Sequence, residues 1–113
     1  MHETSLARKI IEEVVKVAGE KASRVRRVRV AVRPPATVMA EALREGFDLL
    51  KRESLLAGAV LEISEGEMVF FCRDCRRESS GKKMLSSCPH CGSEALRLAR
   101  QGEVYIESVD FAP

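Results

Sequence analysis

The first long pattern in the chain is helical and lies between Ser5 and Gly19. Its apolar residues recur at three- and four-residue steps and form one stripe, which consists of Leu6, Ile10, Ile11, Val14, Val15 and Ala18. This period is typical of an amphipathic helix that buries one face. Thr4 or Ser5 can cap its start, and Gly19 can end it. The helix is therefore predicted to begin almost at the first residue.

A second helix is predicted between about Met39 and Arg52. Four apolar residues in this segment are spaced to share one face, namely Met39, Leu43, Phe47 and Leu50. A stripe of Met, Leu and Phe at this spacing is more typical of a core than of a ligand-binding site. Both helices are thus expected to turn an apolar face towards the interior.

Three segments have the pattern of strands. Residues 25–33 (VRRVRVAVR) alternate, with Val28, Val30 and Val32 on one face and Arg27, Arg29, Ala31 and Arg33 on the other. Alternation with β-branched residues indicates a half-buried strand, and the double proline that follows would end it. Residues 59–63 (AVLEI) and 103–111 (EVYIESVDF) are strand-like as well.

The four cysteines lie between the last two of these strands, in two C-x-x-C motifs. Twelve residues separate the motifs, whose cysteines are Cys72, Cys75, Cys88 and Cys91. Two residues between cysteines let a tight turn direct both thiolates at one ion, and a second such turn completes a tetrahedron. This spacing is typical of a structural zinc site.

Other interpretations of the cysteines are weaker. Two disulfides require an oxidising compartment, whereas the chain starts without the features of a secretory signal peptide. A thioredoxin-like redox centre uses one C-x-x-C motif on a βαβ unit, and paired motifs at this spacing favour zinc over an iron–sulfur cluster. Four thiolates also fill the coordination sphere of zinc, which leaves no position for a substrate water.

The order of these elements predicts an α+β fold. We expect a small three-stranded sheet with two helices on one face, plus an inserted four-cysteine zinc-ribbon module. The two strands that flank the insertion are expected to pair with each other. The predicted domains are residues 1–68 with 102–113, and residues 69–101.

Composition narrows the classes of function. The 113 residues are 45% hydrophobic and 32% charged, as expected for one compact domain plus a small module. No apolar run approaches the roughly 18 residues needed to cross a bilayer. A net charge of +2 and the scarcity of aromatics argue against nucleic-acid binding. The arginines of the first strand are accordingly interpreted as a solvated outer face.

The first three residues, Met1, His2 and Glu3, offer a second set of metal ligands. A free terminal amine, the next amide nitrogen and the imidazole of His2 can close fused chelate rings around one ion. They supply three nitrogens in a plane, an arrangement that Ni(II) and Cu(II) favour. The fourth position stays open for Glu3, for another side chain or for water, so such a site can release its metal.

From residue 1 to residue 111 the chain resembles the HypA/HybF family, the nickel metallochaperones of [NiFe]-hydrogenase maturation. The resemblance is carried by the initial MHE, the helix LARKIIEEVVKVA and the strand VRRVRVAV. It continues through EALREGFDLL, GAVLEI, the first C-x-x-C and CPHCGS to the closing GEVYIESVDF. These segments follow one another in the order expected for the family.

The resemblance implies two metal sites. Ni(II), a transient cargo, would bind through Met1, His2 and nearby backbone nitrogens, with Glu3 assisting, which makes residues 1–68 with 102–113 the nickel-binding domain. Zn(II) would be structural and held by Cys72, Cys75, Cys88 and Cys91. The protein would deliver nickel to the [NiFe]-hydrogenase large-subunit precursor together with the nickel-handling GTPase HypB, and some family members also serve urease maturation. We expect a cytoplasmic protein that is not an enzyme and has no membrane partner.

Some points stay open at this stage. The fourth nickel ligand is unassigned, because the loop 76–87 contains no histidine. His90 is interpreted as an exposed residue of the second cysteine motif in preference to a nickel or zinc ligand. The alternative function is a small zinc-ribbon module that binds nucleic acid, for which the arginines of residues 24–33 and the basic residues of the cysteine loop would be responsible. A zinc hydrolase is excluded, because H-E-x-x-H is absent and the thiolate site has no vacancy.

Overall fold

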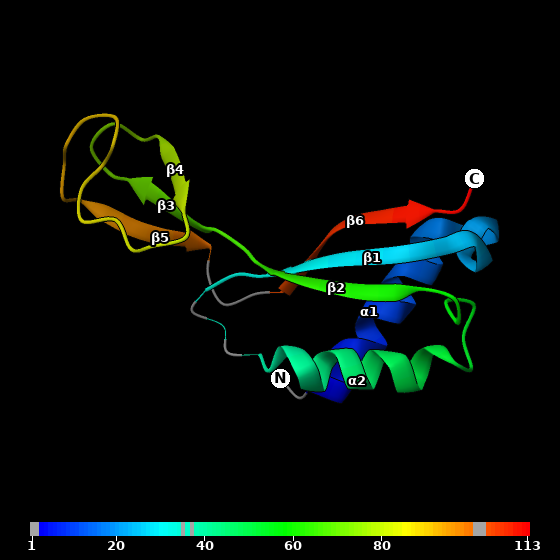
Figure 1. Cartoon of the computed structure of the whole chain (residues 1–113). Helices are drawn as coiled ribbons and strands as arrows, with labels where there is room; N and C mark the ends of the chain where they lie inside the picture. Colours follow the sequence, from blue (N-terminus) through cyan, green and yellow to red (C-terminus); the bar gives the residue numbers. More distant parts are fainter. Residues whose placement is uncertain (1–2, 35, 37, 101–103) are drawn as a thin grey trace. The chain divides into compact units, whose positions relative to one another are not determined.

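The computed structural model describes residues 3–34, 36, 38–100 and 104–113, and the chain divides into two compact units. The helical unit comprises Met1–Ala31, Val38–Ser64 and Tyr105–Pro113, and the ribbon unit comprises Val32–Thr37 and Glu65–Val104. Figure 1 shows the elements of each unit. The predicted assignment of nickel to one domain and zinc to the other stays a prediction.

The first element is helix α1, Glu3–Ala18, followed by the 3₁₀ helix η1, Gly19–Arg24. The stripe predicted from the sequence is its core-facing side, since Leu6, Ile10 and Val14 are all buried. Gly19 has a φ of 57°, a left-handed conformation that glycine adopts without steric cost, so the predicted end of the helix is confirmed. The predicted cap at Thr4 or Ser5 is wrong, because both lie inside the first turn.

Helix α2, Ala40–Lys51, packs against α1. Leu43 and Phe47 are fully buried, as predicted, but Met39 precedes the helix and is 69% exposed. The helices meet at small residues: a Cβ built on Gly46 would lie 3.4 Å from the Cβ of Ala7. This close crossing brings α2 against the first turn of α1.

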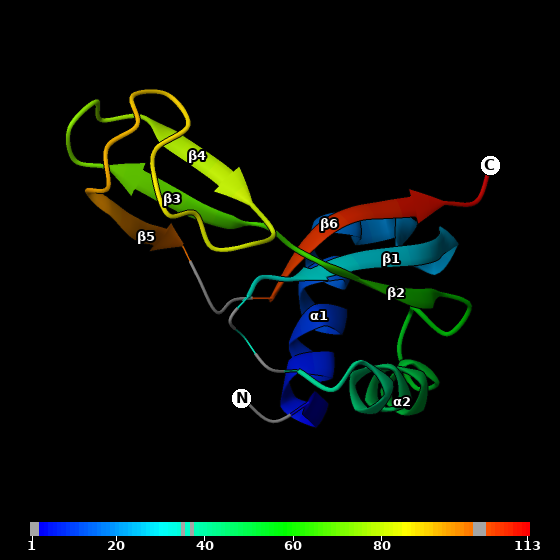
Figure 2. The same cartoon turned by 60° about the vertical axis from the view of Figure 1, so that its left-hand side comes forward.

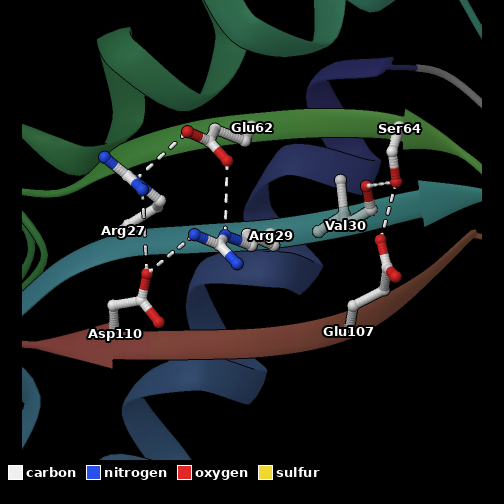
Figure 3. Close-up of polar contacts among 7 residues, drawn as sticks. All are labelled: Arg27, Arg29, Val30, Glu62, Ser64, Glu107 and Asp110. Carbon is white, nitrogen blue, oxygen red and sulfur yellow. Dashed lines mark hydrogen bonds and ion pairs between the residues drawn. The ribbon is translucent and has the colours of Figure 1, made fainter.

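The sheet of the helical unit has the strand order β2-β1-β6. Its strands are β1, Val25–Val32, β2, Val60–Glu65, and β6, Val104–Phe111. The arrows in Figure 3 show β1 and β2 running in the same direction and β6 in the opposite one. The predicted pairing of the two strands that flank the insertion is wrong, because β1 lies between them. The chain can pair β2 in parallel with β1 because α2 provides the long crossover that parallel neighbours require.

Both helices cover one face of this sheet, as Figures 1 and 2 show. The opposite face carries the exposed side chains of Arg27 and Arg29 on β1, as the alternating pattern predicted (Figure 3). The alternation ends early, however: Ala31 and Arg33, both predicted on the outer face, are only 1% and 7% exposed. Val30 is buried as well, as predicted.

The ribbon unit contains a second sheet, with the order β4-β3-β5. Its strands are β3, Met68–Cys72, β4, Glu78–Gly81, and β5, Leu96–Arg100. The central strand β3 is antiparallel to both neighbours, with Phe71 opposite Glu78 and Cys72 opposite Leu96. Its buried residues are Met68, Phe70 and Cys72, which alternate along the strand.

The predicted fold class, α+β with a four-cysteine module, is confirmed by this arrangement. No helix among the described residues is long and apolar enough to span a membrane.

Candidate metal centre

The structure brings the four cysteines together in the ribbon unit. Cys72 ends β3 and Cys75 lies in the turn that follows, whereas Cys88 and Cys91 lie in the loop between β4 and β5. All four are free cysteines, and their Sγ atoms lie within 4.8 Å of one another. They form the one group of three or more potential metal ligands among the described residues.

Each C-x-x-C motif forms a turn of the same kind, which we call a knuckle. In the first knuckle, Cys72 to Cys75, the amide of Arg76 donates to the carbonyl of Cys72 at 2.9 Å. In the second, Cys88 to Cys91, the amide of Gly92 donates to the carbonyl of Cys88 at 2.8 Å. The donor residue has a positive φ in both, 62° for Arg76 and 78° for Gly92. The two motifs thus have matching backbones.

The sulfur atoms have the spacing that a tetrahedral ion requires. Sγ of Cys72 lies 3.6 Å from Sγ of Cys91, and Sγ of Cys75 lies 3.7 Å from Sγ of Cys88. Four sulfurs bound to zinc at about 2.3 Å would be about 3.8 Å apart. The amide of His90 also donates to Sγ of Cys88 at 3.4 Å, which stabilises negative charge on that sulfur. The residues present therefore fit a four-thiolate zinc ion.

The four cysteine thiols differ in pKa. Burial raises the pKa of Cys88, but hydrogen bonds from the backbone of Cys91 and His90 and from neighbouring thiols outweigh it, so the pKa falls to about 6. Hydrogen bonding with the backbone of Cys75 is the main cause of the lowered pKa of Cys72.

The other member of each close sulfur pair behaves in the opposite way. A hydrogen bond from the backbone of Ser93 lowers the pKa of Cys91, but burial and the neighbouring cysteines outweigh it and raise the pKa to about 12. The pKa of Cys75 is also raised: the backbone of Arg77 lowers it, but burial and the sulfurs of Cys88 and Cys72 prevail. Each close pair thus combines a thiol whose pKa is lowered with one whose pKa is raised, and a metal must displace the remaining protons to bind all four as thiolates.

His90 lies outside the sulfur cluster. Its side chain is exposed, as predicted, and its Nε2 is 3.4 Å from the carbonyl oxygen of Glu78. This contact connects the second knuckle with the start of β4.

The predicted nickel ligands lie at the other end of the chain. Met1 and His2 are outside the described residues, and Glu3 is the first residue of α1, where it is half-buried. The carbonyl oxygen of Glu3 lies 3.9 Å from the position a Cβ on Gly46 would occupy. The start of α1 is thus held against α2.

In the helical unit, the outer face of the sheet β2-β1-β6 carries a network of ion pairs (Figure 3). Nε of Arg27 lies 3.2 Å and Nε of Arg29 3.3 Å from the carboxylate of Glu62 on β2. Both guanidinium groups also approach Asp110 on β6, at 3.9 and 3.4 Å. The nucleic-acid alternative depends partly on these arginines. Their charges are paired with carboxylates on the neighbouring strands β2 and β6.

A further polar pair escaped the sequence analysis. The hydroxyl of Ser93, just after the second knuckle, donates a hydrogen bond to Oδ2 of Asp74, inside the first knuckle. The residues are 19 positions apart, and no periodicity connects them. Their closeness to the cysteines in the sequence is the one signal that pointed to them.

Comparisons with known proteins agree with this architecture. The family model described as "Hydrogenase/urease nickel incorporation, metallochaperone, hypA" matches residues 1–111. A hydrogenase maturation factor HypA from Beijerinckia indica subsp. indica is 37% identical over 111 residues, which are 97% of this chain and 98% of that protein. The HypA of Xanthobacter autotrophicus is 38% identical over 97 residues, 85% of this chain and 86% of that protein.

A solved structure has the same fold. The solution structure of the Ni metallochaperone HypA from Helicobacter pylori matches with a TM-score of 0.72 and 22% sequence identity, over 98% of this chain and 97% of that one. At this identity the match bears on the fold alone. The family match and the curated relatives cover nearly the whole chain, and they are maturation factors and metallochaperones, which agrees with the prediction that the protein is not an enzyme. The chain therefore belongs to the HypA family of hydrogenase/urease nickel-incorporation metallochaperones.

Proposed function

We propose that this protein binds Ni(II) at its N-terminus and delivers it to the [NiFe]-hydrogenase large-subunit precursor. The observation that carries the proposal is the family match, which begins at residue 1 and so includes Met1, His2 and Glu3. A terminal amine, an amide nitrogen and the imidazole of His2 form the planar nitrogen set that Ni(II) favours. A fourth, exchangeable position would allow the ion to be passed on.

The four cysteines would hold a separate, structural zinc ion. The ligands are Cys72, Cys75, Cys88 and Cys91, whose thiols already lie within 4.8 Å of one another. Zinc would join the knuckles by four bonds and offer no open position, so it would stabilise the ribbon unit without taking part in nickel exchange.

The partners follow from the same proposal. A nickel-handling GTPase of the HypB kind would supply or accept the ion, and the hydrogenase large-subunit precursor would receive it. The family description names urease as well as hydrogenase, so urease maturation proteins are a second class of client. With these partners, the protein would act in the cytoplasm.

Removal of the imidazole of His2 tests the nickel site. Untagged His2→Ala protein is expected to lose Ni(II) binding in equilibrium dialysis at neutral pH while keeping one zinc per chain by elemental analysis. His90→Ala is the matched control, because the chain contains two histidines and this variant removes the other one. One residue added before Met1 should also weaken nickel binding, since the terminal amine then becomes an amide.

Nickel uptake by His2→Ala equal to that of the unaltered protein would contradict the N-terminal site. Loss of nickel in His90→Ala instead would move the site to the ribbon unit. The zinc content, measured in the same samples, separates both results from a failure of the ribbon to fold.

A further inference from the structure

The two knuckles are held in the ribbon unit by very different means. The first begins in β3, which pairs with strands on both sides. The second lies in residues 82–95, all of them described, which form no helix or strand. The backbone ladder that fixes Cys72 therefore has no counterpart at Cys88 and Cys91. Their position must depend on side-chain contacts, on short-range turns and on the metal.

Besides the two sulfur–sulfur contacts, a hydrogen bond between side chains joins the first knuckle to the residue that follows Gly92. Oγ of Ser93 donates to the carboxylate of Asp74, which lies between the two cysteines of the first knuckle. The same Oγ accepts from the amide of Ala95 at 3.0 Å, so the hydroxyl is oriented towards Asp74. A hydroxyl that donates to a carboxylate forms a charge-assisted hydrogen bond, which is stronger than a neutral one.

Backbone contacts extend this contact to the cysteines themselves. The carbonyl of Ser93 accepts from the amide of Cys88 at 2.7 Å, so Ser93 fixes the start of the second knuckle. The amide of Arg73 donates to the carbonyl of Ala95 at 3.0 Å, which links the same two segments as the side-chain contact does. A displacement of Ser93 would thus move Cys88 relative to the first knuckle.

From this arrangement we infer that Asp74 and Ser93 are a positioning pair, which holds the second knuckle beside the first before a metal binds. The inference rests on the proposed zinc site and adds the residues that preorganise it. Without the pair, the metal itself would have to order the loop, and its affinity would fall by the cost of that ordering. Residues that orient metal ligands from outside the coordination sphere typically change affinity by about 10- to 100-fold.

Zinc affinity of the whole protein, measured in competition with a chelator of known affinity, tests the pair. Asp74→Ala and Ser93→Ala are each expected to weaken binding by about 10- to 100-fold. The double variant should be no weaker than the stronger single one, because both remove the same contact. Glu94→Ala is the matched control: it removes an exposed carboxylate next to Ser93 and should leave affinity within about 2-fold.

Two conservative variants separate positioning from a general loss of stability. Asp74→Asn retains an oxygen acceptor and should recover part of the zinc affinity lost in Asp74→Ala. Ser93→Thr retains the hydroxyl and should likewise recover part of the affinity lost in Ser93→Ala. In Co(II)-loaded protein, a displaced knuckle should also alter the visible ligand-field spectrum of the tetrathiolate site. Asp74→Ala is expected to broaden this spectrum and Glu94→Ala to leave it unchanged.

Hydrogen exchange of the reduced, zinc-free protein tests the inference without any metal. The amides of Cys88 and Gly92 should exchange faster in Asp74→Ala than in the unaltered protein. Equal exchange, affinities equal to that of Glu94→Ala, or additive losses in the double variant would each overturn the role of the pair. Unaltered protein that takes up no zinc would overturn the zinc assignment instead, and the exchange measurement would still judge the pair.

Discussion

Arg76 and Gly92 occupy equivalent places in the two knuckles, with φ values of 62° and 78°. A left-handed backbone costs an L-residue about 1 kcal/mol or more, whereas glycine adopts it freely. The chain therefore has a strained residue after one knuckle and an unstrained one after the other. Arg76 keeps this conformation because its amide closes the turn on the carbonyl of Cys72.

Exchanging these residue types should change stability in opposite directions. Gly92→Ala is expected to destabilise the ribbon unit by about 1 kcal/mol through backbone strain alone, because nothing lies within 4 Å of the added Cβ. Arg76→Gly should be neutral or stabilising by up to about 1 kcal/mol. Urea unfolding of the zinc-loaded protein, followed by a probe in the ribbon, measures both. A destabilising Arg76→Gly would show that the arginine side chain outweighs the strain.

At the residue scale, the metal ligands could be predicted from the sequence, whereas the residues that position them could not. The spacing of Cys72, Cys75, Cys88 and Cys91 predicted a cluster because a two-residue gap has few conformations, and the structure shows that cluster. The contact between Asp74 and Ser93 could not be predicted in this way, since it depends on the conformation of a loop with no periodicity. Met1 and His2, the remaining predicted ligands, stay a prediction from chemistry and resemblance.

Among the elements, the crossing of α1 and α2 depends on a small residue at position 46. A Cβ on Gly46 would meet the Cβ of Ala7 at 3.4 Å and the Cα of Thr4 at 3.7 Å, so a methyl group fits in van der Waals contact and a larger side chain would press against the first turns of α1. Because Glu3 and Thr4 belong to the first turn of α1, this crossing also determines the position of the residues beside the proposed nickel ligands.

Two substitutions at Gly46 should separate these effects. Gly46→Ala is expected to be tolerated or to stabilise by up to about 1 kcal/mol, because alanine is the better helix former. Gly46→Leu should destabilise by about 1–3 kcal/mol through overpacking and should also weaken Ni(II) binding, because it displaces the first turn of α1. Urea midpoints and nickel dialysis measure the two consequences. Glu45→Leu, on the exposed neighbouring residue, is the control and should change neither quantity appreciably.

The elements also show where sequence patterns end. The buried faces were predicted by the stripe of α1, by Leu43 and Phe47 in α2 and by the alternation of β1 between Arg27 and Val30, because each follows the period of one regular element. The pairing of β2 and β6 was predicted wrongly because strand order is not a local property: β1 offers two edges, and a crossover helix allows β2 to occupy one of them.

At the scale of the whole molecule, each unit has buried apolar residues of its own, and the helices found in the described part of the chain belong to one unit. The described helices α1 and α2 belong to the helical unit, whereas Met68, Phe70, Cys72 and Cys88 form the buried core of the ribbon unit. If zinc holds the ribbon together, its loss should affect one core and leave the other intact.

Acid provides the test of this separation. The pKa of Cys88 is lowered to about 6, so its thiolate persists above that pH and gains a proton below it. Zinc affinity should therefore decrease as the pH falls, most steeply below about 6, where one more proton competes with the metal. Zinc release, measured with a fluorescent chelator, should be accompanied by faster amide exchange in β3 and β5, while the helical circular dichroism signal persists. Simultaneous loss of both would show that the units fold as one.

The position of β6 has a consequence for synthesis of the chain on the ribosome. This strand completes a sheet whose central strand, β1, is made long before it, and the entire ribbon sequence comes between them. The edge of β1 that pairs with β6 consequently stays unpaired with it until the cysteine-containing segment has left the ribosome. The ribbon unit can therefore bind its metal ion while the sheet of the helical unit still lacks β6.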